Sequence, residues 1–500
     1  MDTDIILNRA SGAALDSASC YRALAAKDAR FDGVFFTGVK TTGIYCRPVC
    51  GVKTPRASSC VFFSSAAAAE AAGFRPCLRC RPELAPYALQ QNLAHAVWQC
   101  IAAGALNDGD TEGLAEKVGL SSRQLRRVLL QHFGVTPVEL AQTQRLLFAK
   151  KLLQETHLSM SDIAFASGFG SVRRFNALFL SRYGMAPTAI RRAAETPEEA
   201  KHDALTLRLA YRPPFAWDEM LSYLAGRAIP GVEAVDAQNK GAWSYARSVR
   251  LGQASGWLRV AHLPQRHQLE LSVSNTLAHV LMPLVARVRQ QFDLDANPEV
   301  IAAHLSADPL LARQIDSAPG LRVPGAFDVF ELATRAVLGQ QISVSGATTL
   351  SGRIVRAFGE ASDTPFIGVS QYFPTPQRLA GLQASDIAAI GMPTARADTL
   401  RNLASFAIAG GLDMAPGTTL DDALARLRTV RGIGEWTAQY IAMRALRFPD
   451  AFPAGDLGLQ KAGVETKDGA RLTEKQLLAR AAHWSPWRAY AALLLWHSLK

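Results

Sequence analysis

The sequence predicts a multidomain protein with a small α+β domain at the N-terminus, an all-α domain, a second α+β domain and an all-α C-terminal domain. Its 500 residues exceed the usual size of one domain and suggest three to four. All seven cysteines lie within residues 20–100, which marks a separate N-terminal module. Strand-like alternation over residues 205–285 gives way to an almost entirely helical pattern from Asp293 onward.

Composition restricts the class of protein. Apolar residues make up 49% of the chain, and no apolar run approaches the ~18 residues that a membrane span needs. The first ten residues, MDTDIILNRA, are acidic and lack a small-residue cleavage site, so they do not form a signal peptide. We therefore expect a cytoplasmic protein without membrane partners, whose cysteines stay reduced.

The charge distribution predicts a nucleic-acid partner. The net charge is +11, and residues 40–82 contain seven lysines and arginines but a single acid, Glu70. Such a cluster is typical of a surface that meets phosphate, although charge alone gives affinity without sequence preference.

Two short cysteine pairs are spaced as metal ligands. The first pair is Cys46-x3-Cys50 and the second is Cys77-x2-Cys80, with 26 residues between the pairs. Four thiolates in this pattern can close a tetrahedral structural Zn²⁺ site, so we expect one zinc ion. Two disulfides or unrelated thiols are the alternative, which a reducing cytosol disfavours.

The residues around these cysteines, FTGVKTTGIYCRPVC and AAGFRPCLRCRPE, resemble the N-terminal domain of the Ada adaptive-response family over residues 1–85. The resemblance implies that the Cys46 thiolate accepts a methyl group from a DNA methyl-phosphotriester, while the other three cysteines support the zinc. Zinc keeps a thiol deprotonated, and the thiolate is the nucleophile. Methylation would remove a negative charge and strengthen DNA binding through the arginines nearby. These arginines are Arg47, Arg75, Arg79 and Arg81.

Residues 86–192 contain a weak internal repeat. The segments GLSSRQLRRVLLQHFGVTP, from Gly119, and GFGSVRRFNALFLSRYGMAP, from Gly168, each follow a short helix and a glycine-containing turn. This is the helix-turn-helix plan, and it resembles the tandem domain of AraC-type regulators, with a connecting helix over residues 142–154. Each arginine could instead be a solvated surface charge. The predicted DNA-facing residues are Ser122, Arg123, Arg126, Ser171, Arg173 and Arg174.

Residues 193–203, AAETPEEAKHD, are polar and acidic, and we interpret them as a linker that separates the two halves of the chain. Beyond this segment, residues 424–459 contain two helical segments separated by Arg431-Gly432-Ile433-Gly434. The unpaired N–H groups at the start of the second helix favour a phosphate. Trp436 and Tyr440 lie on one face of this helix, and Asp456 follows in a Pro-Ala-Gly-Asp loop. An ordinary helix pair closed by a glycine turn is the alternative.

This hairpin resembles the helix-hairpin-helix signature of the DNA glycosylase superfamily. From Leu205 to the C-terminus the chain is similar to the AlkA family of 3-methyladenine DNA glycosylases, in segments such as YRPPFAWDEMLSYLAGRA, AVLGQQISV, YFPTPQRLAGL, RGIGEWTAQYIAMRAL and HWSPWRAYAALLLW. The resemblance implies an α+β AlkA N-terminal domain over residues 204–290 and an all-α helix-hairpin-helix glycosylase domain over residues 291–500.

The same resemblance implies a set of site residues. Asp456 would stabilise the positive charge that develops on the sugar, while the base leaves the helical stack. Asp456 as a simple helix cap and the aromatic residues as core packing are the alternatives. The implied base pocket consists of Trp436, Tyr440, Trp496 and Tyr223. The implied DNA contacts of this half are Gly432, Gly434 and Gln341.

Some departures from related families are informative. Bifunctional lyases carry a lysine where Trp436 stands, so a monofunctional enzyme is expected. Gln341 occupies the position of an apolar wedge residue in AlkA, and a polar side chain here can still occupy the gap left by the flipped base. No cysteine follows Cys100, so no iron–sulfur loop is expected, and the methyltransferase domain of Ada is missing.

Together these observations predict a bacterial protein of the alkylation-damage response. We expect a glycosylase for alkylated bases, fused to a methyl-phosphotriester sensor that regulates transcription. The alternative is a transcription regulator whose glycosylase half is vestigial. The expected partners are alkylated and promoter double-stranded DNA and RNA polymerase, and the expected oligomeric state is a monomer.

Overall fold

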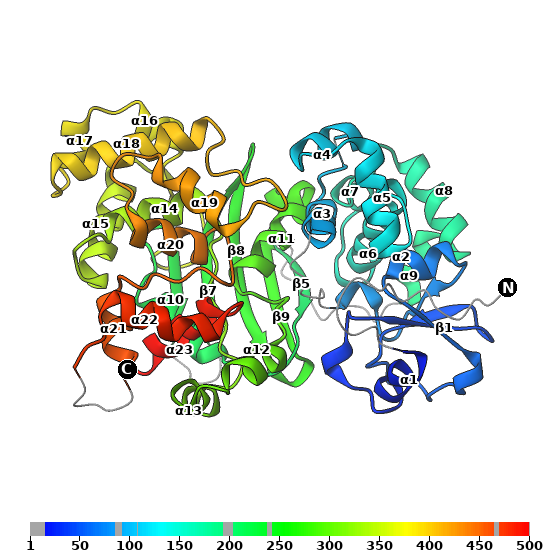
Figure 1. Ribbon diagram of the computed structural model, residues 1–500. Coiled ribbons are helices and arrows are strands. Elements are labelled where there is room, and N and C mark those ends of the chain that lie inside the picture. Colours follow the sequence, from blue (N-terminus) through cyan, green and yellow to red (C-terminus); the bar gives the residue numbers. More distant parts are fainter. Residues whose placement is uncertain are drawn as a thin grey trace.

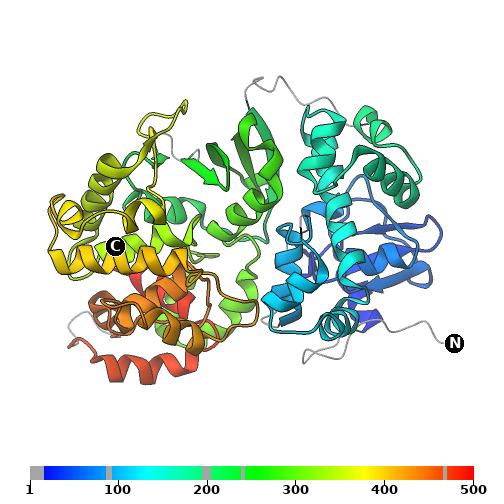
Figure 2. The same cartoon turned by 90° about the horizontal axis from the view of Figure 1, so that it is seen from above.

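The computed structural model describes residues 16–85, 93–107, 109–193, 204–237, 243–464 and 470–499. Figures 1 and 2 show two lobes side by side, one formed by residues 16–193 and the other by residues 204–499. We call them the N-terminal lobe and the C-terminal lobe. Residues 194–203 of the predicted linker lie outside the described residues. In the described part of the chain no helix is long and apolar enough to cross a membrane.

The N-terminal module is built on a four-stranded sheet in the order β3-β1-β2-β4. Strand β2 runs parallel to β4, and Tyr45 on β2 lies opposite Pro76 on β4. The next residues along the chain are Cys46 and Cys77, so both cysteines lie at the same end of the sheet. The elements of this module are α1 (Ser17–Ala25), η1 (Ala29–Phe31), β1 (Phe36–Val39), β2 (Ile44–Cys46), η2 (Ala57–Ser59), β3 (Cys60–Phe63), α2 (Ala66–Ala71), β4 (Arg75–Pro76) and η3 (Pro82–Leu84). The predicted small α+β domain is confirmed.

The middle of the chain is all helical, as predicted. Its helices are α3 (Leu93–Ala102), α4 (Thr111–Lys117), α5 (Ser122–Phe133), α6 (Pro137–Glu155), α7 (Met160–Ala166), α8 (Val172–Tyr183) and α9 (Pro187–Ala193). The two copies of the repeat end alike, because α5 and α8 stop at Gly134 (φ 72°) and Gly184 (φ 68°), a conformation that glycine adopts without strain. The connecting helix α6 is longer than the predicted 142–154.

The C-terminal lobe begins with a five-stranded antiparallel sheet in the order β5-β9-β8-β7-β6. Alternate residues of β5 are buried, which fits a sheet with one face against the core. The elements are β5 (Ala204–Ala210), α10 (Trp217–Ala225), β6 (Glu233–Asp236), β7 (Ser244–Leu251), β8 (Ala254–Leu263), η4 (Pro264–Arg266), β9 (Gln268–Ser274) and η5 (Asn275–Val280).

Helices make up nearly all of the remainder, around one large apolar core. The exception is a two-stranded ladder, β10 (Glu360–Ala361) with β11 (Gln371–Tyr372). The helices are α11 (Leu281–Gln291), α12 (Pro298–Leu305), α13 (Pro309–Ser317), α14 (Val329–Leu338), α15 (Val344–Phe358), α16 (Pro376–Ala380), α17 (Ala384–Ala388), α18 (Thr394–Ile408), α19 (Leu420–Arg428), α20 (Glu435–Arg444), α21 (Leu457–Ala462), α22 (Glu474–Ala481), η6 (Ala482–Trp484) and α23 (Arg488–His497).

The two lobes are in contact, although the sequence suggested halves separated by a linker. Arg212, just after β5, donates from Nε and Nη2 to the carbonyl oxygen of Asp32 at 3.1 and 2.9 Å. Its Nη1 donates to the carbonyl oxygen of Asp295 at 2.7 Å. Lys151 on α6 donates to the carbonyl oxygen of Arg208 on β5. Because Arg212 and Lys151 are buried, these contacts form part of the packed interior.

Helix α6 also holds the N-terminal module. The Lys150 ammonium, fully buried, donates to the carbonyl oxygen of Cys77 at 3.2 Å and to Glu83 at 2.6 Å. Thr143 donates to the buried Glu70 at 3.0 Å. Helix α6 therefore contacts the cysteine-bearing module on one side and the sheet of the C-terminal lobe on the other.

Candidate functional site

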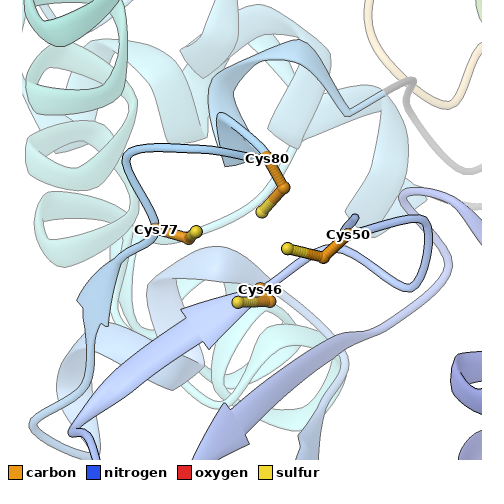
Figure 3. A group of neighbouring side chains, drawn as sticks. All are labelled: Cys46, Cys50, Cys77 and Cys80. Atoms are coloured by element: carbon orange, nitrogen blue, oxygen red, sulfur yellow. The ribbon is translucent and has the colours of Figure 1, made fainter. Parts of the chain in front are cut away.

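The four predicted metal ligands converge. The Sγ atoms of Cys46, Cys50, Cys77 and Cys80 all lie within 4.8 Å of one another, and Figure 3 shows the sulfurs turned toward a common centre. Tetrahedral zinc with Zn–S bonds of about 2.3 Å would place its sulfurs roughly 3.8 Å apart, so a cage of this size suits Zn²⁺. All seven cysteines are free, which argues against the disulfide alternative.

Hydrogen bonds among the thiols shift the pKa values of the four cysteines in opposite directions. Hydrogen bonding with Cys46 lowers the pKa of Cys50 to about 7 and also lowers the pKa of Cys77. Hydrogen bonds within the cage raise the pKa of Cys46, chiefly through Cys50, and that of Cys80, chiefly through Cys46. Hydrogen bonds among the thiols thus favour ionisation of only some of them, and a divalent metal would hold all four in the ionised form.

The arginines near the cage differ in their surroundings. Arg47 is buried, forms an ion pair with Asp32, and donates to the carbonyl oxygen of Cys80 at 3.1 Å. It therefore braces the cage and does not face solvent, unlike the DNA-facing position that the sequence predicted. Arg81 pairs with Glu83 and with Glu155 of α6. Arg79 is exposed and Arg75 is half-buried, so these two remain available to a phosphate.

The arginines of the repeat lie at the surface. Arg123 and Arg126 on α5, and Arg173 and Arg174 on α8, are all exposed. Ser171 caps α8 by accepting a hydrogen bond from the backbone N–H of Arg174 at 3.2 Å, whereas Ser122 is the half-buried first residue of α5. Both helices thus present charged side chains in their N-terminal halves, where a recognition helix contacts DNA.

The glycine hairpin joins α19 to α20. Gly432 has φ 97°, and a Cβ at this position would lie 2.0 Å from Oγ1 of Thr399, so the turn requires glycine. Gly434 is the exposed residue before α20. Gln340 ties a second loop to this turn, because its Nε2 donates to the carbonyl oxygen of Gly432 at 2.9 Å. Its neighbour Gln341 is exposed, with a left-handed φ of 58°, and therefore lies next to the hairpin.

Asp456 is held by three donors. Its Oδ1 accepts from the backbone N–H of Leu459 at 3.0 Å and from the indole N–H of Trp496 at 3.0 Å. Its Oδ2 accepts from the indole N–H of Trp436 at 3.2 Å. The carboxylate is thus the N-cap of α21 and also accepts hydrogen bonds from two indoles of an aromatic cluster, so the helix-cap alternative and the catalytic position are compatible.

The four predicted pocket aromatics come together. The rings of Trp436 and Tyr440 stack, with centroids 5.4 Å apart and planes 11° apart, and Trp496 lies 6.3 Å from Tyr440. The Tyr223 hydroxyl from α10 lies 3.4 Å from that of Tyr440. Trp436, Tyr440 and Trp496 are half-buried, whereas Tyr223 is buried.

Two arginines of this cluster were not predicted. Arg444, buried on α20, donates from Nη1 to the hydroxyls of Tyr223 (2.9 Å) and Tyr440 (2.7 Å). The guanidinium carbon of Arg227 lies 3.8 Å from the ring centre of Tyr223. Each arginine follows its tyrosine by four residues, and this helical spacing was the signal available in the sequence.

These charges act on Tyr440. Burial opposes ionisation of the phenol, but the positive charges of Arg444 and Arg227 and the hydrogen bond with Tyr223 outweigh it and lower the pKa of Tyr440 to about 8. The ring of Tyr223 is already covered by Arg227, so the exposed aromatic surface is that of the other three rings.

A four-thiol metal cage, a tandem helix-turn-helix and a glycine hairpin beside a carboxylate define a DNA-repair protein joined to a regulatory half. Four families match successive parts of the chain. They are the metal binding domain of Ada (residues 19–83), a helix-turn-helix domain (114–193), the AlkA N-terminal domain (206–328) and the HhH-GPD superfamily of base excision DNA repair proteins (334–482).

Individual relatives match along nearly all of their length. A Mycobacterium tuberculosis protein named "Probable bifunctional transcriptional activator/DNA repair enzyme AlkA" is 39% identical over 492 residues, which cover 97% of each chain. DNA-3-methyladenine glycosylase 2 of Escherichia coli is 35% identical over 292 residues, 58% of this chain and 96% of its own. The chain therefore belongs to the family of bifunctional transcriptional activator/DNA repair AlkA proteins, and the predicted family is confirmed.

A solved structure supports the fold of the C-terminal lobe. The 3-methyladenine DNA-glycosylase from Archaeoglobus fulgidus superposes with a TM-score of 0.50 at 19% identity, over 58% of this chain and 96% of its own. The described residues thus combine a glycosylase fold with DNA-binding and metal-binding modules.

Proposed function

We propose that the C-terminal lobe is a monofunctional DNA glycosylase that excises alkylated, 3-methyladenine-type bases. The observation that carries this proposal is the Asp456 carboxylate, held by two indole N–H groups and one backbone N–H at the edge of an aromatic cluster. A carboxylate fixed in this way can stabilise an oxocarbenium-like sugar and orient the attacking water. Water adds at C1′ as the base leaves, and an abasic site remains.

The same aromatic cluster would select the base. A flipped base could stack on the half-buried rings of Trp436, Tyr440 and Trp496. The faces of these rings attract a positive charge by about 0.5–2 kcal/mol each, which favours a cationic alkylated base over a neutral one. Gly432, Gly434 and Gln341, which lie together beside the pocket, would contact the DNA backbone and the gap left by the flipped base.

Release of free base from methylated duplex DNA by the purified chain tests this activity. We expect multiple turnovers, abasic DNA as the product, and no strand cleavage by the protein. A chain that binds methylated DNA but releases no base would favour the alternative, a regulator with a vestigial glycosylase half.

We propose a second activity for the N-terminal module, the stoichiometric acceptance of a methyl group at Cys46. The four-thiol cage suits one Zn²⁺, held by Cys46, Cys50, Cys77 and Cys80, which when bound keeps the acceptor sulfur ionised. The Cys46 Sγ forms a bond to the methyl carbon, the carbon–oxygen bond of the methyl-phosphotriester breaks, and its electron pair stays on the phosphate. The product is a phosphodiester, and the cysteine becomes a neutral thioether.

This transfer would switch the affinity for DNA. Loss of one negative charge from the cage reduces repulsion of phosphate near the surface residues Arg75 and Arg79. The helix-turn-helix repeat would then bind a promoter tightly and activate transcription. RNA polymerase as a further partner, the monomeric state and the cytoplasmic location stay predictions.

Peptide mass analysis after incubation with methyl-phosphotriester DNA tests the acceptor. We expect a single added methyl group, on Cys46. A methyl group on Cys80, the half-buried member of the cage, would contradict the assignment.

A further inference from the structure

The contact between the N-terminal module and helix α6 contains a network of charged side chains. Lys150 of α6 pairs with Glu83 at 2.6 Å, and Glu83 also pairs with Arg81 at 3.0 Å. Arg81 reaches Glu155 of α6 at 2.7 Å, and Glu155 pairs with Lys151 at 2.9 Å. No member exposes more than 16% of its side chain, so we call these five residues the buried charge cluster.

The buried charge cluster holds more positive than negative charge. Its three cations face two carboxylates, which leaves one positive charge in excess. Burial opposes ionisation of Glu83, but the charges of Lys150 and Arg81 outweigh it and lower its pKa. Burial lowers the pKa of Lys151 to about 8, so this amine is still mostly charged at pH 7. Burial raises the pKa of Glu70, which also senses Lys150, to about 7, so Glu70 adds at most part of a negative charge.

Lys150 brings this charge to the metal cage. Its ammonium, fully buried, donates to the carbonyl oxygen of Cys77 at 3.2 Å. The Arg47 guanidinium makes a similar contact with the carbonyl oxygen of Cys80 at 3.1 Å, but an ion pair with Asp32 neutralises its charge. The excess positive charge of the cluster therefore lies against the cage on the side of α6.

Methyl transfer changes the charge of the cage by one unit. Four thiolates around a divalent metal carry two negative charges in excess, and conversion of one thiolate into a thioether leaves one. The electron pair of the breaking carbon–oxygen bond stays on the phosphate, so negative charge moves from the Cys46 sulfur to the DNA. A cation buried behind the cage attracts the charge that leaves, and it therefore stabilises the unmethylated cage more than the transition state.

The same cation favours retention of the metal. Thiols outside a metal site are mostly protonated at neutral pH, so the cysteines lose their negative charge when the metal leaves and the module unfolds. A positive charge buried beside the cage thus stabilises the metal-loaded fold. Retention of the metal and reactivity of the sulfur should respond to this charge in opposite directions.

We propose that the buried charge cluster, through Lys150, is the counter-ion of the metal cage, which secures the metal and restrains the reactivity of the Cys46 thiolate. This assignment rests on the proposed methyl acceptance at Cys46. Lys150 is a positioning residue, because it acts through its charge on the cage and is buried away from the DNA. The match to the metal binding domain ends at residue 83, so a residue of the helical middle domain completes the sensor.

The test uses the full-length, zinc-loaded chain and follows two rates. These are the methylation of Cys46 at saturating methyl-phosphotriester DNA and the loss of zinc to a chelator. Lys150→Met keeps the length of the side chain but removes its charge, while Arg81 still pairs with Glu83. We expect both methylation and zinc loss to become about tenfold faster. Lys150→Arg should restore both rates.

Two further variants separate charge from packing. Leu147, three residues before Lys150, packs into an apolar core of the N-terminal module, so Leu147→Ala loosens the contact with α6 without a change of charge. It should lose zinc faster but accept the methyl group no faster. Glu83→Gln adds to the excess positive charge, so it should accept the methyl group more slowly without losing zinc faster.

The outcomes decide the assignment. A zinc-loaded Lys150→Met chain that accepts the methyl group no faster than the parent overturns it, and so does equal acceleration in Leu147→Ala. If Lys150→Met cannot be loaded with zinc, Glu83→Gln decides, and unchanged or faster methylation there overturns the assignment.

Failure of the proposed methyl acceptance is a separate result. If the parent chain accepts no methyl group at Cys46, that activity is wrong, and zinc loss alone tests the counter-ion. Equal rates of zinc loss in Lys150→Met and the parent then overturn the counter-ion as well. Faster loss that Lys150→Arg restores supports it.

Discussion

The four-cysteine cage and the Asp456 pocket both gather negative charge near the protein surface, but they neutralise it by different means. In the pocket, three N–H groups of the protein itself point at the carboxylate. In the cage, the thiols share protons with one another, and the backbone N–H of Arg47 donates to Cys80 Sγ at 3.4 Å. The pocket is complete as the chain folds, whereas the cage needs a cation.

Because of this difference, loss of metal and substitution of side chains should affect the two regions differently. The cage depends on a metal that chelation can remove, and its ligands lie at the ends of the short strands β2 and β4 and in the loops that follow them. The pocket depends on side chains of α10, α20 and α23, which belong to the large core of the C-terminal lobe. Loss of metal should therefore act on folding, while substitutions in the pocket should act on chemistry.

The largest expected effect is that of losing the metal. Cys77→Ser should reduce bound zinc from about one ion per chain to none and unfold the N-terminal module, because metal binding of this kind contributes on the order of 10 kcal/mol to folding. Base release should persist, since the pocket lies in the other lobe. Metal analysis, circular dichroism and the glycosylase assay measure these three outcomes.

Cys60→Ser is the matched control, because Cys60 is half-buried and lies outside the cage. It should keep its zinc and its folded module. If reduced wild-type protein binds no zinc, the proposed dependence of the N-terminal module on a metal is wrong.

A smaller effect, confined to chemistry, is expected at Asp456. Asp456→Asn should lower base release by at least about 100-fold, because the neutral amide cannot stabilise the developing positive charge. The amide oxygen can still accept the N–H of Leu459, so α21 should stay capped and DNA binding should persist. Asp328→Asn is the control, since Asp328 caps α14 in the same way through Glu331 N–H. Activity of Asp456→Asn within tenfold of the parent would contradict the assignment.

The sequence predicted the parts of these sites that depend on local pattern. The cysteine spacing predicted the cage, and the glycine hairpin with its downstream aspartate indicated the region of Asp456, whereas the four pocket aromatics were implied by the resemblance to the AlkA family. It did not predict Arg444 and Arg227, because an arginine on an amphipathic helix usually faces water. Arg444 is buried against tyrosines of two helices, α10 and α20, that meet only in the folded lobe, and Arg227 is half-buried just after the end of α10.

The contact between the lobes was missed for the same reason. Lys151 resembles part of a solvated helical face in the sequence, and its partner Arg208 belongs to the other lobe. The length of α6 was, by contrast, available from local pattern, because Thr136 and Glu139 form a capping box that marks the helix start.

Substitution of Arg212 tests whether the two lobes unfold together. Arg212→Ala removes two hydrogen bonds to the carbonyl oxygen of Asp32 and one to that of Asp295, all three in the packed interior. We expect a loss of about 3 kcal/mol in the free energy of unfolding. In calorimetry the N-terminal lobe should then unfold at a lower temperature than the C-terminal lobe.

Arg313→Ala provides the control, because Arg313 is exposed on α13 and should change stability by less than about 0.5 kcal/mol. If Arg212→Ala behaves like this control, the contact between the lobes contributes nothing to stability, and the two sites are independent.

The smallest expected effect concerns the charge of the pocket itself. The pKa of Tyr440 is lowered from 10.0 to about 8, since Arg444 and Arg227 outweigh the effect of burial. A depressed folded-state pKa contributes stability that is present above pH 10 and is lost as the pH falls through 8. Tyr440 is therefore neutral at pH 7 and becomes a phenolate between pH 7 and pH 9, the range in which the folded pocket gains a negative charge.

A base that carries a fixed positive charge should respond to this ionisation. We expect its release to rise about threefold between pH 7 and pH 9, through the attraction of a partly screened charge, and release of a neutral base to stay level. Tyr440→Phe should abolish the rise while keeping the stacked ring. Tyr372→Phe, the same change on β11 away from the pocket, should retain it. A rise that persists in Tyr440→Phe would mean that another group titrates, and the pocket would then select the cationic base by its ring faces alone, without help from the phenol.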